Sequence, residues 1–108
     1  MQAIQKCVCA KDDFARAVGD YVADAAKAAI AARGKFFLAL SGGSLIAQLA
    51  EALEPLGAAL QTELWEVFTV DERVVPVTDA DSNHGALQKT LYSKVRALTH
   101  TQHYLFFI

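Results

Sequence analysis

The feature that most constrains the fold is a strand-like run that passes directly into a helical pattern. The apolar run Phe36–Leu40 stops at Ser41–Ser44, which reads Ser-Gly-Gly-Ser, and an alanine- and leucine-rich stretch with helical spacing follows at once. An uninterrupted apolar run is typical of a strand covered on both faces, as the strands of parallel sheets are. Because parallel strands are joined by crossovers, usually helices, the sequence predicts a strand–turn–helix unit of an α/β domain.

The rest of the chain continues this alternation of short apolar runs and helical patterns. The expected strands are Ala3–Cys9, Phe36–Leu40, Leu64–Val70 and His103–Ile108. The expected helices run from Asp12 or Asp13 to Gly34, from Ser44 to Leu53 and from Ser82 to Val95. Val74–Thr78 contains a proline and is expected to be a loop. This order predicts an α/β sandwich with a mostly parallel sheet and right-handed crossovers.

Two of the helical patterns predict which side chains face the core. In the first helix, apolar residues recur at three-and-four spacing, namely Phe14, Val18, Tyr21, Val22, Ala25, Ala29 and Ile30. Gly34 is expected to end this helix as a left-handed cap. Ser82 is expected to cap the third helix at its N-terminus, with Ala86, Leu87, Leu91, Tyr92 and Val95 facing inward.

The length and the last residues of the chain bear on its domain organisation. A chain of 108 residues is one domain at most. It stops on an apolar strand pattern with no polar tail and no covering helix, and an exposed apolar edge strand favours aggregation. We therefore expect residues 1–108 to form a single α/β domain that is incomplete, the amino-terminal part of a longer domain.

Charge and cysteine content exclude several classes of partner. The net charge is −2, and no basic stripe or basic amphipathic helix is present, so neither nucleic acid nor a membrane is expected as a partner. Cys7 and Cys9 are the only cysteines. Zinc requires four ligands and no second pair exists, so buried thiols are expected rather than a metal site. Two unpaired thiols suit a cytoplasmic protein.

The glycine pair lies where α/β sheets bind their ligands. Ser41–Ser44 follows the carboxyl end of an expected strand, and open α/β sheets bind ligands outside those ends. Glycine lets the backbone approach a ligand closely, the first amides of the helix carry partial positive charge, and Ser41 and Ser44 add hydroxyl donors. These groups predict an anion cradle, most simply for phosphate. The alternative is a tight turn with serine caps. The loop matches neither the ATP-type P-loop nor the dinucleotide-binding motif.

Three consecutive charged residues end the next expected strand. In a parallel sheet, Asp71, Glu72 and Arg73 fall on the same edge as the glycine loop. Arg73 can fork onto a phosphate or a carboxylate, and Asp71 and Glu72 can accept hydrogen bonds from sugar hydroxyls. The alternative is a solvated strand end in which Arg73 pairs with a neighbouring carboxylate. Their position beside the glycine loop favours a role in ligand binding.

Four features in a fixed order make the chain similar to a known family. They are the Ser-Gly-Gly-Ser loop, the strand ending in Asp-Glu-Arg, the Val-Pro pair that follows, and the Ser-Asn start of the next helix. From about Phe14 to Val95 the sequence resembles the 6-phosphogluconolactonase family, which shares a superfamily with glucosamine-6-phosphate deaminases and isomerases. The deaminase branch typically has a Thr-Gly-Ser loop and an Asp-Glu-Tyr strand end, so the lactonase branch fits this sequence better.

This resemblance implies a fold, a reaction and a set of site residues. The implied fold is a modified Rossmann-like, three-layer sandwich. The implied reaction is hydrolysis of 6-phospho-D-glucono-1,5-lactone to 6-phosphogluconate in the oxidative pentose phosphate pathway, with no cofactor and no metal, by a protein that is monomeric when complete. The implied substrate-binding residues are Ser41, Gly42, Gly43, Ser44, Asp71, Glu72 and Arg73. Among them, Arg73 is expected to contact an anionic group directly.

The family's catalytic histidine has no counterpart in this sequence. Its proposed general base belongs to a Gly-x-Asp-Gly-His segment well downstream, and no such segment occurs in residues 1–108. His84 is expected to pack or to cap a helix. Structural roles are expected for His100 and His103 too, because a histidine base needs an orienting partner. No catalytic residue is therefore assigned within this chain.

Three functions remain open from the sequence. The first is a 6-phosphogluconolactonase, represented by its amino-terminal portion. The second is a deaminase or isomerase of amino-sugar phosphates, which ammonia release would separate from lactone hydrolysis. The third is a non-catalytic short form that binds sugar phosphate without turnover or folds only with a partner.

Overall fold

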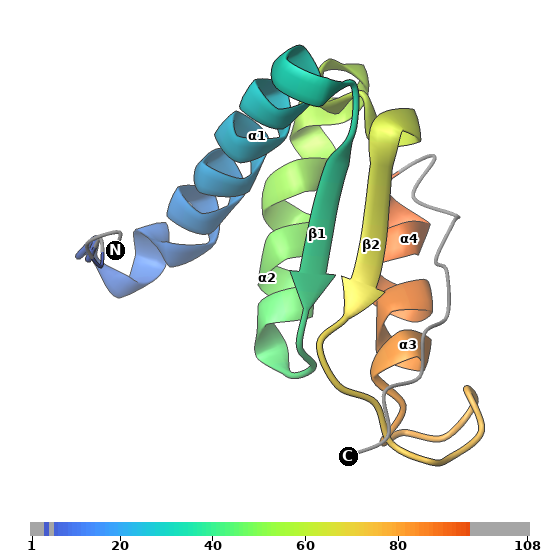
Figure 1. Cartoon of the computed structure of the whole chain (residues 1–108). Coiled ribbons are helices and arrows are strands. Elements are labelled where there is room, and N and C mark those ends of the chain that lie inside the picture. The colour runs from blue at the N-terminus through green and yellow to red at the C-terminus, as the bar shows by residue number, and fades with distance from the viewer. Residues whose placement is uncertain (1–3, 5, 96–108) are drawn as a thin grey trace.

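A pair of parallel strands forms the centre of the molecule. The computed structural model describes Ile4 and residues 6–95 of the 108-residue chain. Strands β1 (Phe36–Leu40) and β2 (Trp65–Thr69) pair in parallel. Parallel pairing requires the chain to return to the starting end of the sheet between strands, and α2 (Ser44–Leu53) makes that return (Figure 1). The predicted α/β class with a parallel sheet is confirmed.

Helices form most of the remaining described chain. The long helix α1 (Phe14–Arg33) precedes β1. A helical stretch after Ser82 consists of α3 (Asn83–Ala86), a π-helical turn (Leu87–Leu91) and α4 (Tyr92–Lys94). Short 3₁₀ segments occupy Lys11–Asp13, Glu54–Leu60 and Thr62–Leu64. The predicted bounds of β1 and α2 match those observed, and the helix predicted after Ser82 is confirmed.

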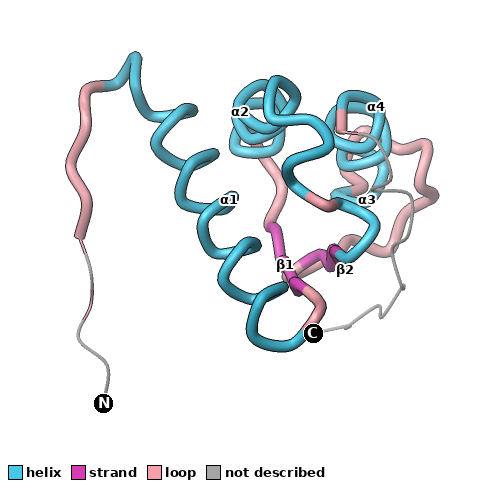
Figure 2. Tube along the Cα trace, turned by 90° about the horizontal axis from the view of Figure 1, so that it is seen from above, coloured by secondary structure: helices cyan, strands magenta, loops and turns pink. Residues whose placement is uncertain are grey.

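The described helices cover one face of the sheet and leave the other uncovered. Helix α2 and the α3–α4 stretch lie on the same side of the two strands (Figure 2). Phe36, Leu40 and Val67 are buried. Phe37, on the other face, is 50% exposed, and its ring centroid lies 6.4 Å from that of Phe68. The prediction that β1 is buried on both faces is therefore wrong for the described chain, because the described helices leave the Phe37 side uncovered.

Trp65 anchors β2 in the core. Its ring meets that of Phe36, its partner in the parallel register, edge-on at a centroid distance of 4.9 Å. Its indole N–H donates to the carbonyl oxygen of Leu60 at 2.9 Å, which supplies the partner that a buried indole nitrogen needs. These contacts fix the start of the strand whose far end leads into Asp71.

Helix α1 packs on α2 through a narrower face than its sequence pattern predicts. Val22 and Ala29 are buried as expected. Phe14 and Tyr21 are 41% and 66% exposed, so the prediction that both rings face the core is wrong. Small residues form the buried line of α1, and the two large rings lie outside it.

The two ends of α1 differ in how well the sequence predicts them. Gly34 has a φ of 78° and donates its N–H to the carbonyl oxygen of Ile30 at 2.8 Å, so the predicted left-handed cap is confirmed. Asp13 occupies the N-cap position, but its side chain makes no capping hydrogen bond. Its carboxylate instead lies 3.6 Å from the guanidinium of Arg16.

The segment before α1 is not a strand. Lys6–Ala10 has no regular secondary structure, and Ile4 and Val8 lie almost fully in solvent. The predicted strand Ala3–Cys9 is therefore wrong over its described residues, because the sheet that the structure describes consists of β1 and β2 alone. The expected strand His103–Ile108 lies outside the described residues.

The helical stretch after Ser82 docks through the predicted face. Leu87, Leu91 and Val95 are buried, and Ala86 and Tyr92 are partly buried against the same core. This docking brings the N-terminal end of the stretch close to the strand ends. The position of Ser82 and Asn83, at the start of this stretch, therefore depends on the docking.

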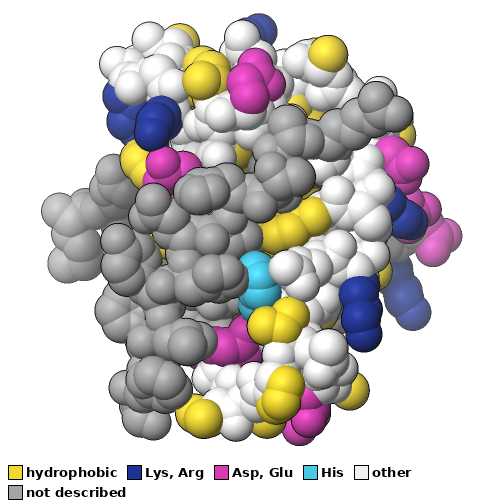
Figure 3. All heavy atoms as spheres, turned by 90° about the vertical axis from the view of Figure 1, so that its right-hand side faces the viewer, with side chains coloured by type: hydrophobic (Ala, Val, Ile, Leu, Met, Phe, Trp, Pro, Cys, Tyr) yellow, Lys and Arg dark blue, Asp and Glu magenta, His cyan; other side chains and the backbone are white. Residues whose placement is uncertain are grey.

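The described surface carries charges of both signs. On the described part of the face in Figure 3, acidic and basic side chains are interspersed rather than gathered by sign. Within residues 6–95, no helix combines the length and the apolar character needed to cross a membrane.

Candidate functional site

A cleft lies at the edge of the sheet where both strands end. β1 and β2 point the same way, toward the turn into α2 and the loop after β2 (Figure 1). The cleft has a volume of about 480 Å³ and is lined by Ser41, Gly42, Gly43, Asp71, Arg73, Ala80, Ser82, Asn83 and Ala86. The glycine loop and the charged strand end thus meet in one cleft. Of the predicted binding residues, only Ser44 and Glu72 lie outside its lining.

The two glycines of the loop serve different purposes. Gly43 has a φ of 94°, which side chains rarely tolerate, although a Cβ there would meet open space. Gly42 has no positive φ, but a Cβ there would collide with the amide oxygen of Asn83. Gly43 occupies the N-cap position of α2 and has no side chain to accept from the first amides. The Ile46 N–H donates to the Gly43 carbonyl oxygen at 3.4 Å, and the amides of Ser44 and Leu45 before it lie at the positive end of the helix, where an anion can bind.

Glu72 holds the start of the helical stretch that follows Ser82, which is the third segment of the cleft after the glycine loop and the end of β2. Its Oε1 accepts from the backbone N–H groups of Arg73 and Asn83 at 2.9 and 2.8 Å. Its Oε2 accepts from the N–H of His84 at 2.7 Å and from the hydroxyl of Ser82 at 3.4 Å. A carboxylate at a helix N-terminus satisfies amides that lack partners within the helix. Glu72 therefore ties the end of β2 to the start of α3, and both carboxylate oxygens are already engaged.

Partial burial and hydrogen bonding act on Glu72 in opposite directions. Burial raises the pKa of its carboxyl group, whereas the hydrogen bonds from Arg73, His84, Asn83 and Ser82 lower it. The hydrogen bonds outweigh burial and hold the pKa below its ordinary value of 4.5. Because the folded-state pKa lies below the unfolded value, the stabilisation is complete above about pH 4.5. It is lost as the pH falls from there through the folded-state pKa.

We expect Glu72→Gln to remove this acid-sensitive stabilisation. At neutral pH the variant should unfold at lower urea concentration than the wild type, because an amide nitrogen replaces one acceptor oxygen. The gap should narrow as the pH falls below about 4.5, where the wild type loses its own charge. Urea unfolding across the pH range measures this. Glu51→Gln, an exposed position on α2, is the control, and a gap that stays constant with pH would contradict the capping role.

Arg73 and Asp71 supply the charged groups of the cleft. Both are exposed at the end of β2. The Nη1 of Arg73 donates to the carbonyl oxygen of Asp81 at 2.9 Å, so this nitrogen contacts a backbone carbonyl rather than a carboxylate. A guanidinium has five N–H donors in a planar fork, and the rest of the fork can receive an anion. The cleft thus combines a cation, a helix N-terminus and a carboxylate, which suits a ligand with both a phosphate and hydroxyl groups.

Asn83 belongs to the site although the sequence reading assigned it only to a helix start. It is 6% exposed, and its Nδ2 donates to the backbone oxygen of Asp71 at 3.0 Å and to the Asp71 Oδ1 at 3.3 Å. Ser82 caps the helix as predicted, since its hydroxyl accepts from the Gly85 N–H at 3.0 Å. Asn83 follows this cap directly, and its link to Asp71 spans twelve positions, beyond the reach of sequence patterns.

The described histidine and cysteines lie outside the cleft lining. His84 is buried, with its ring centroid 6.5 Å from that of Tyr92, which fits the packing role expected of it. His100 and His103 lie outside the described residues. Cys7 and Cys9 are exposed free thiols, so the expectation that they are buried is wrong. Among residues 6–95 and Ile4, no group of three or more potential ligands is placed to hold a metal ion.

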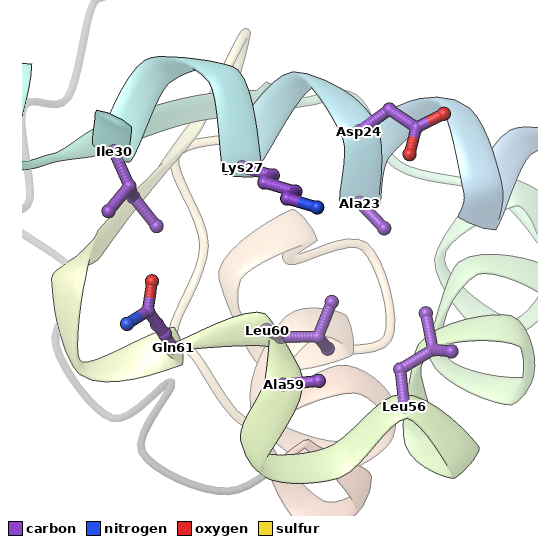
Figure 4. Close-up of a pocket in the computed structure, with 8 residues that line it drawn as sticks. All are labelled: Ala23, Asp24, Lys27, Ile30, Leu56, Ala59, Leu60 and Gln61. Carbon is purple, nitrogen blue, oxygen red and sulfur yellow. The ribbon is translucent and has the colours of Figure 1, made fainter. Parts of the chain in front are cut away.

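A second hollow lies away from the strand ends. It has a volume of about 160 Å³ between α1 and the segment 54–61. Figure 4 shows Lys27 extending along it, opposite Leu60, with Ile30 and Leu56 at its sides. Its lining holds one ammonium group and one carboxylate among mainly apolar side chains. It lacks the converging polar groups that mark the first cleft.

Comparisons with known proteins identify the family of the chain. Residues 10–106 match the family model described as glucosamine-6-phosphate isomerases/6-phosphogluconolactonase. The chain belongs to this family. The "6-phosphogluconolactonase 3" of Saccharomyces cerevisiae is 37% identical over 81 residues, which cover 72% of this chain and 32% of that protein. A rice protein named "Probable 6-phosphogluconolactonase 3, chloroplastic" (Oryza sativa) is 45% identical over 87 residues, or 80% of this chain and 27% of that protein.

Solved structures in the family share the fold. A crystal structure of a 6-phosphogluconolactonase from Shewanella baltica OS155 matches 88% of this chain and 40% of that chain, with a TM-score of 0.74 and 23% identity. The predicted Rossmann-like α/β fold is confirmed. The chain spans about a third of the length of the curated family members that it matches.

Proposed function

We propose that this chain provides the sugar-phosphate-binding edge of a 6-phosphogluconolactonase. The reaction is the hydrolysis of 6-phospho-D-glucono-1,5-lactone to 6-phosphogluconate, in the oxidative pentose phosphate pathway. The observation that carries the proposal is the single cleft in which Gly42, Gly43, Asp71 and Arg73 meet. The relatives named as lactonases support the same reaction.

Each group of the cleft has a role in this proposal. The amides at the start of α2, with the hydroxyls of Ser41 and Ser44, receive an anionic group of the substrate. Arg73 adds a charge-assisted contact to the same anion, and Asp71 accepts from a sugar hydroxyl. Glu72 acts indirectly, since its carboxylate holds the segment that completes the cleft.

The described lining of the cleft supplies groups that bind a sugar phosphate but no general base for hydrolysis. Opening a lactone requires an activated water molecule and stabilisation of the developing oxyanion. Among the described residues, Asp71 and Arg73 are the only titratable residues in the cleft lining, and neither belongs to an arrangement in which a histidine base is held by a partner. We therefore assign binding to the described residues and the general base to a residue outside them. The proposal requires no cofactor and no metal, and it assigns the protein to the cytoplasm, as a monomer when complete.

The decisive experiment separates three outcomes on the full chain. Purified chain is given 6-phosphogluconolactone and, separately, glucosamine-6-phosphate, and binding of 6-phosphogluconate is followed by NMR. Lactone hydrolysis above the spontaneous rate, or binding of 6-phosphogluconate without hydrolysis, supports the proposed cleft. Binding without hydrolysis would mean that the general base lies outside the purified chain. Ammonia release from glucosamine-6-phosphate would overturn the lactonase assignment in favour of the isomerase branch.

We expect Gly43→Val to weaken 6-phosphogluconate binding roughly tenfold. A β-branched residue at a φ of 94° costs about 1–3 kcal/mol of backbone strain, and the loop relieves it by moving the first amides of α2. Gly57→Val is the matched control, because Gly57 also has a positive φ and open space around its missing Cβ. It should lose similar stability but keep full binding. Equal binding by the wild type and Gly43→Val would remove the loop from the site.

A further inference from the structure

We propose that Asn83 is a positioning residue that sets the spacing between the glycine loop and Asp71. It reaches both strand ends from the third segment of the cleft, so it joins the two halves of the binding edge. This inference rests on the proposed function, because it explains how the same cleft holds a sugar phosphate at two points.

On one side, Asn83 holds Asp71. Its Nδ2 donates to the backbone oxygen of Asp71 at 3.0 Å and to the carboxylate Oδ1 at 3.3 Å. The first contact fixes the chain at the end of β2, and the second fixes the direction of the carboxylate. A carboxylate that is held in one direction loses little freedom when it accepts from a sugar hydroxyl, which favours binding.

On the other side, the Asn83 amide oxygen faces the glycine loop. A Cβ on Gly42 would collide with this oxygen, and it is the nearest atom in the way. The backbone of Gly42 has no positive φ, so its conformation does not itself demand glycine. Asn83 therefore explains the first glycine of the pair, just as the backbone conformation explains Gly43.

The helix start does not need this side chain for its own stability. Ser82 caps the Gly85 N–H through its hydroxyl, and Glu72 accepts from the N–H groups of Asn83 and His84. With the backbone of Asn83 held by Glu72, its side chain is directed into the gap between the two strand ends. It is 6% exposed there, so it occupies a fixed place rather than moving in solvent.

The test is a double-mutant cycle between positions 42 and 83. Asn83→Ala should weaken 6-phosphogluconate binding by about two- to tenfold, because the Asp71 carboxylate is then no longer held in one direction. Gly42→Ala should weaken it more, by over about tenfold, since its methyl group drives the whole Asn83 side chain off Asp71 and that side chain must then be accommodated elsewhere. The double variant should return to the level of Asn83→Ala, because the shortened side chain leaves room for the methyl group.

A nearly isosteric variant separates positioning from packing. Asn83→Asp keeps the volume but places a carboxylate oxygen against the backbone oxygen and the carboxylate Oδ1 of Asp71. This variant should therefore bind 6-phosphogluconate more weakly than Asn83→Ala. A packing role alone predicts the reverse order. The same variants are unfolded in urea without ligand, where Gly42→Ala and Asn83→Ala should also couple.

Each result has a defined meaning. Tight binding by the wild type with independent, multiplicative effects at positions 42 and 83 would overturn the role of Asn83 and leave the proposed function intact. Failure of the wild type to bind 6-phosphogluconate would overturn the proposed function. In that case the ligand-free unfolding cycle decides the inference: coupling supports the Asn83 link, and additive effects overturn it.

Discussion

Replacing Arg73 by alanine is expected to weaken 6-phosphogluconate binding by about 10- to 100-fold. Arg73 lines the same cleft as the glycine loop, and one of its guanidinium nitrogens contacts the Asp81 carbonyl oxygen. A charge-assisted hydrogen bond contributes roughly 1.5–3 kcal/mol, which corresponds to that change in affinity. The free energy of unfolding should fall by less than about 1 kcal/mol, because the side chain is exposed.

Two further variants make the Arg73 experiment specific. Arg73→Lys keeps the charge but loses the planar fork, so its affinity should lie between those of the wild type and Arg73→Ala. Arg16→Ala removes another exposed arginine, which pairs with Asp13 at the start of α1, and should leave binding unchanged. Titration calorimetry measures the affinities. An unchanged affinity in Arg73→Ala, or a large loss of stability, would assign Arg73 to holding the Asp79–Asp81 turn instead.

The second large effect is expected from Leu87→Ala. Leu87 is fully buried in the π-helical turn that follows α3. Truncating such a leucine costs about 2–5 kcal/mol, since it removes apolar contacts and leaves a cavity. That loss is a large share of the roughly 5–15 kcal/mol that stabilises a typical domain. The helical stretch that carries Ser82 and Asn83 would then hold the third wall of the cleft less firmly.

Urea unfolding followed by circular dichroism measures the effect of Leu87→Ala. Gln88→Ala, one residue along and exposed, is the matched control and should change the free energy of unfolding by less than about 0.5 kcal/mol. A loss below about 1 kcal/mol in Leu87→Ala would mean that the helical stretch does not depend on the core for its position.

The sequence predicted the elements that carry their own local signals. β1 has an uninterrupted apolar run and α2 has a clear turn before it, so the bounds of both are as predicted. Gly34 and Ser82 are residue types whose capping chemistry acts over a few positions, and both cap as expected. Parallel pairing alone predicts that Arg73 and the glycine loop lie at the same edge of the sheet, because each follows the carboxyl end of a strand.

The features that the sequence did not predict depend on distant partners. The apolar pattern of β1 cannot show that the described helices leave Phe37 uncovered. The sequence predicted that Glu72 binds the ligand, whereas the structure shows its carboxylate accepting from backbone N–H groups. Two of these donors, Asn83 and His84, lie eleven and twelve positions further along the chain. The contact between Asn83 and Gly42 is shape complementarity between segments about forty residues apart, and no periodicity records it.

Trp65 gives the chain an internal optical probe. It is the single tryptophan, and its indole is shielded from water between Phe36 and the Leu60 carbonyl group. Its fluorescence can be excited apart from that of the tyrosines, and water reaching the ring shifts the emission to longer wavelength. The emission therefore reports, without any added label, whether the first residue of β2 is still packed in the core. A variant that weakens binding in the cleft alone should leave the emission wavelength unchanged. A variant that loosens the core should shift the emission to longer wavelength.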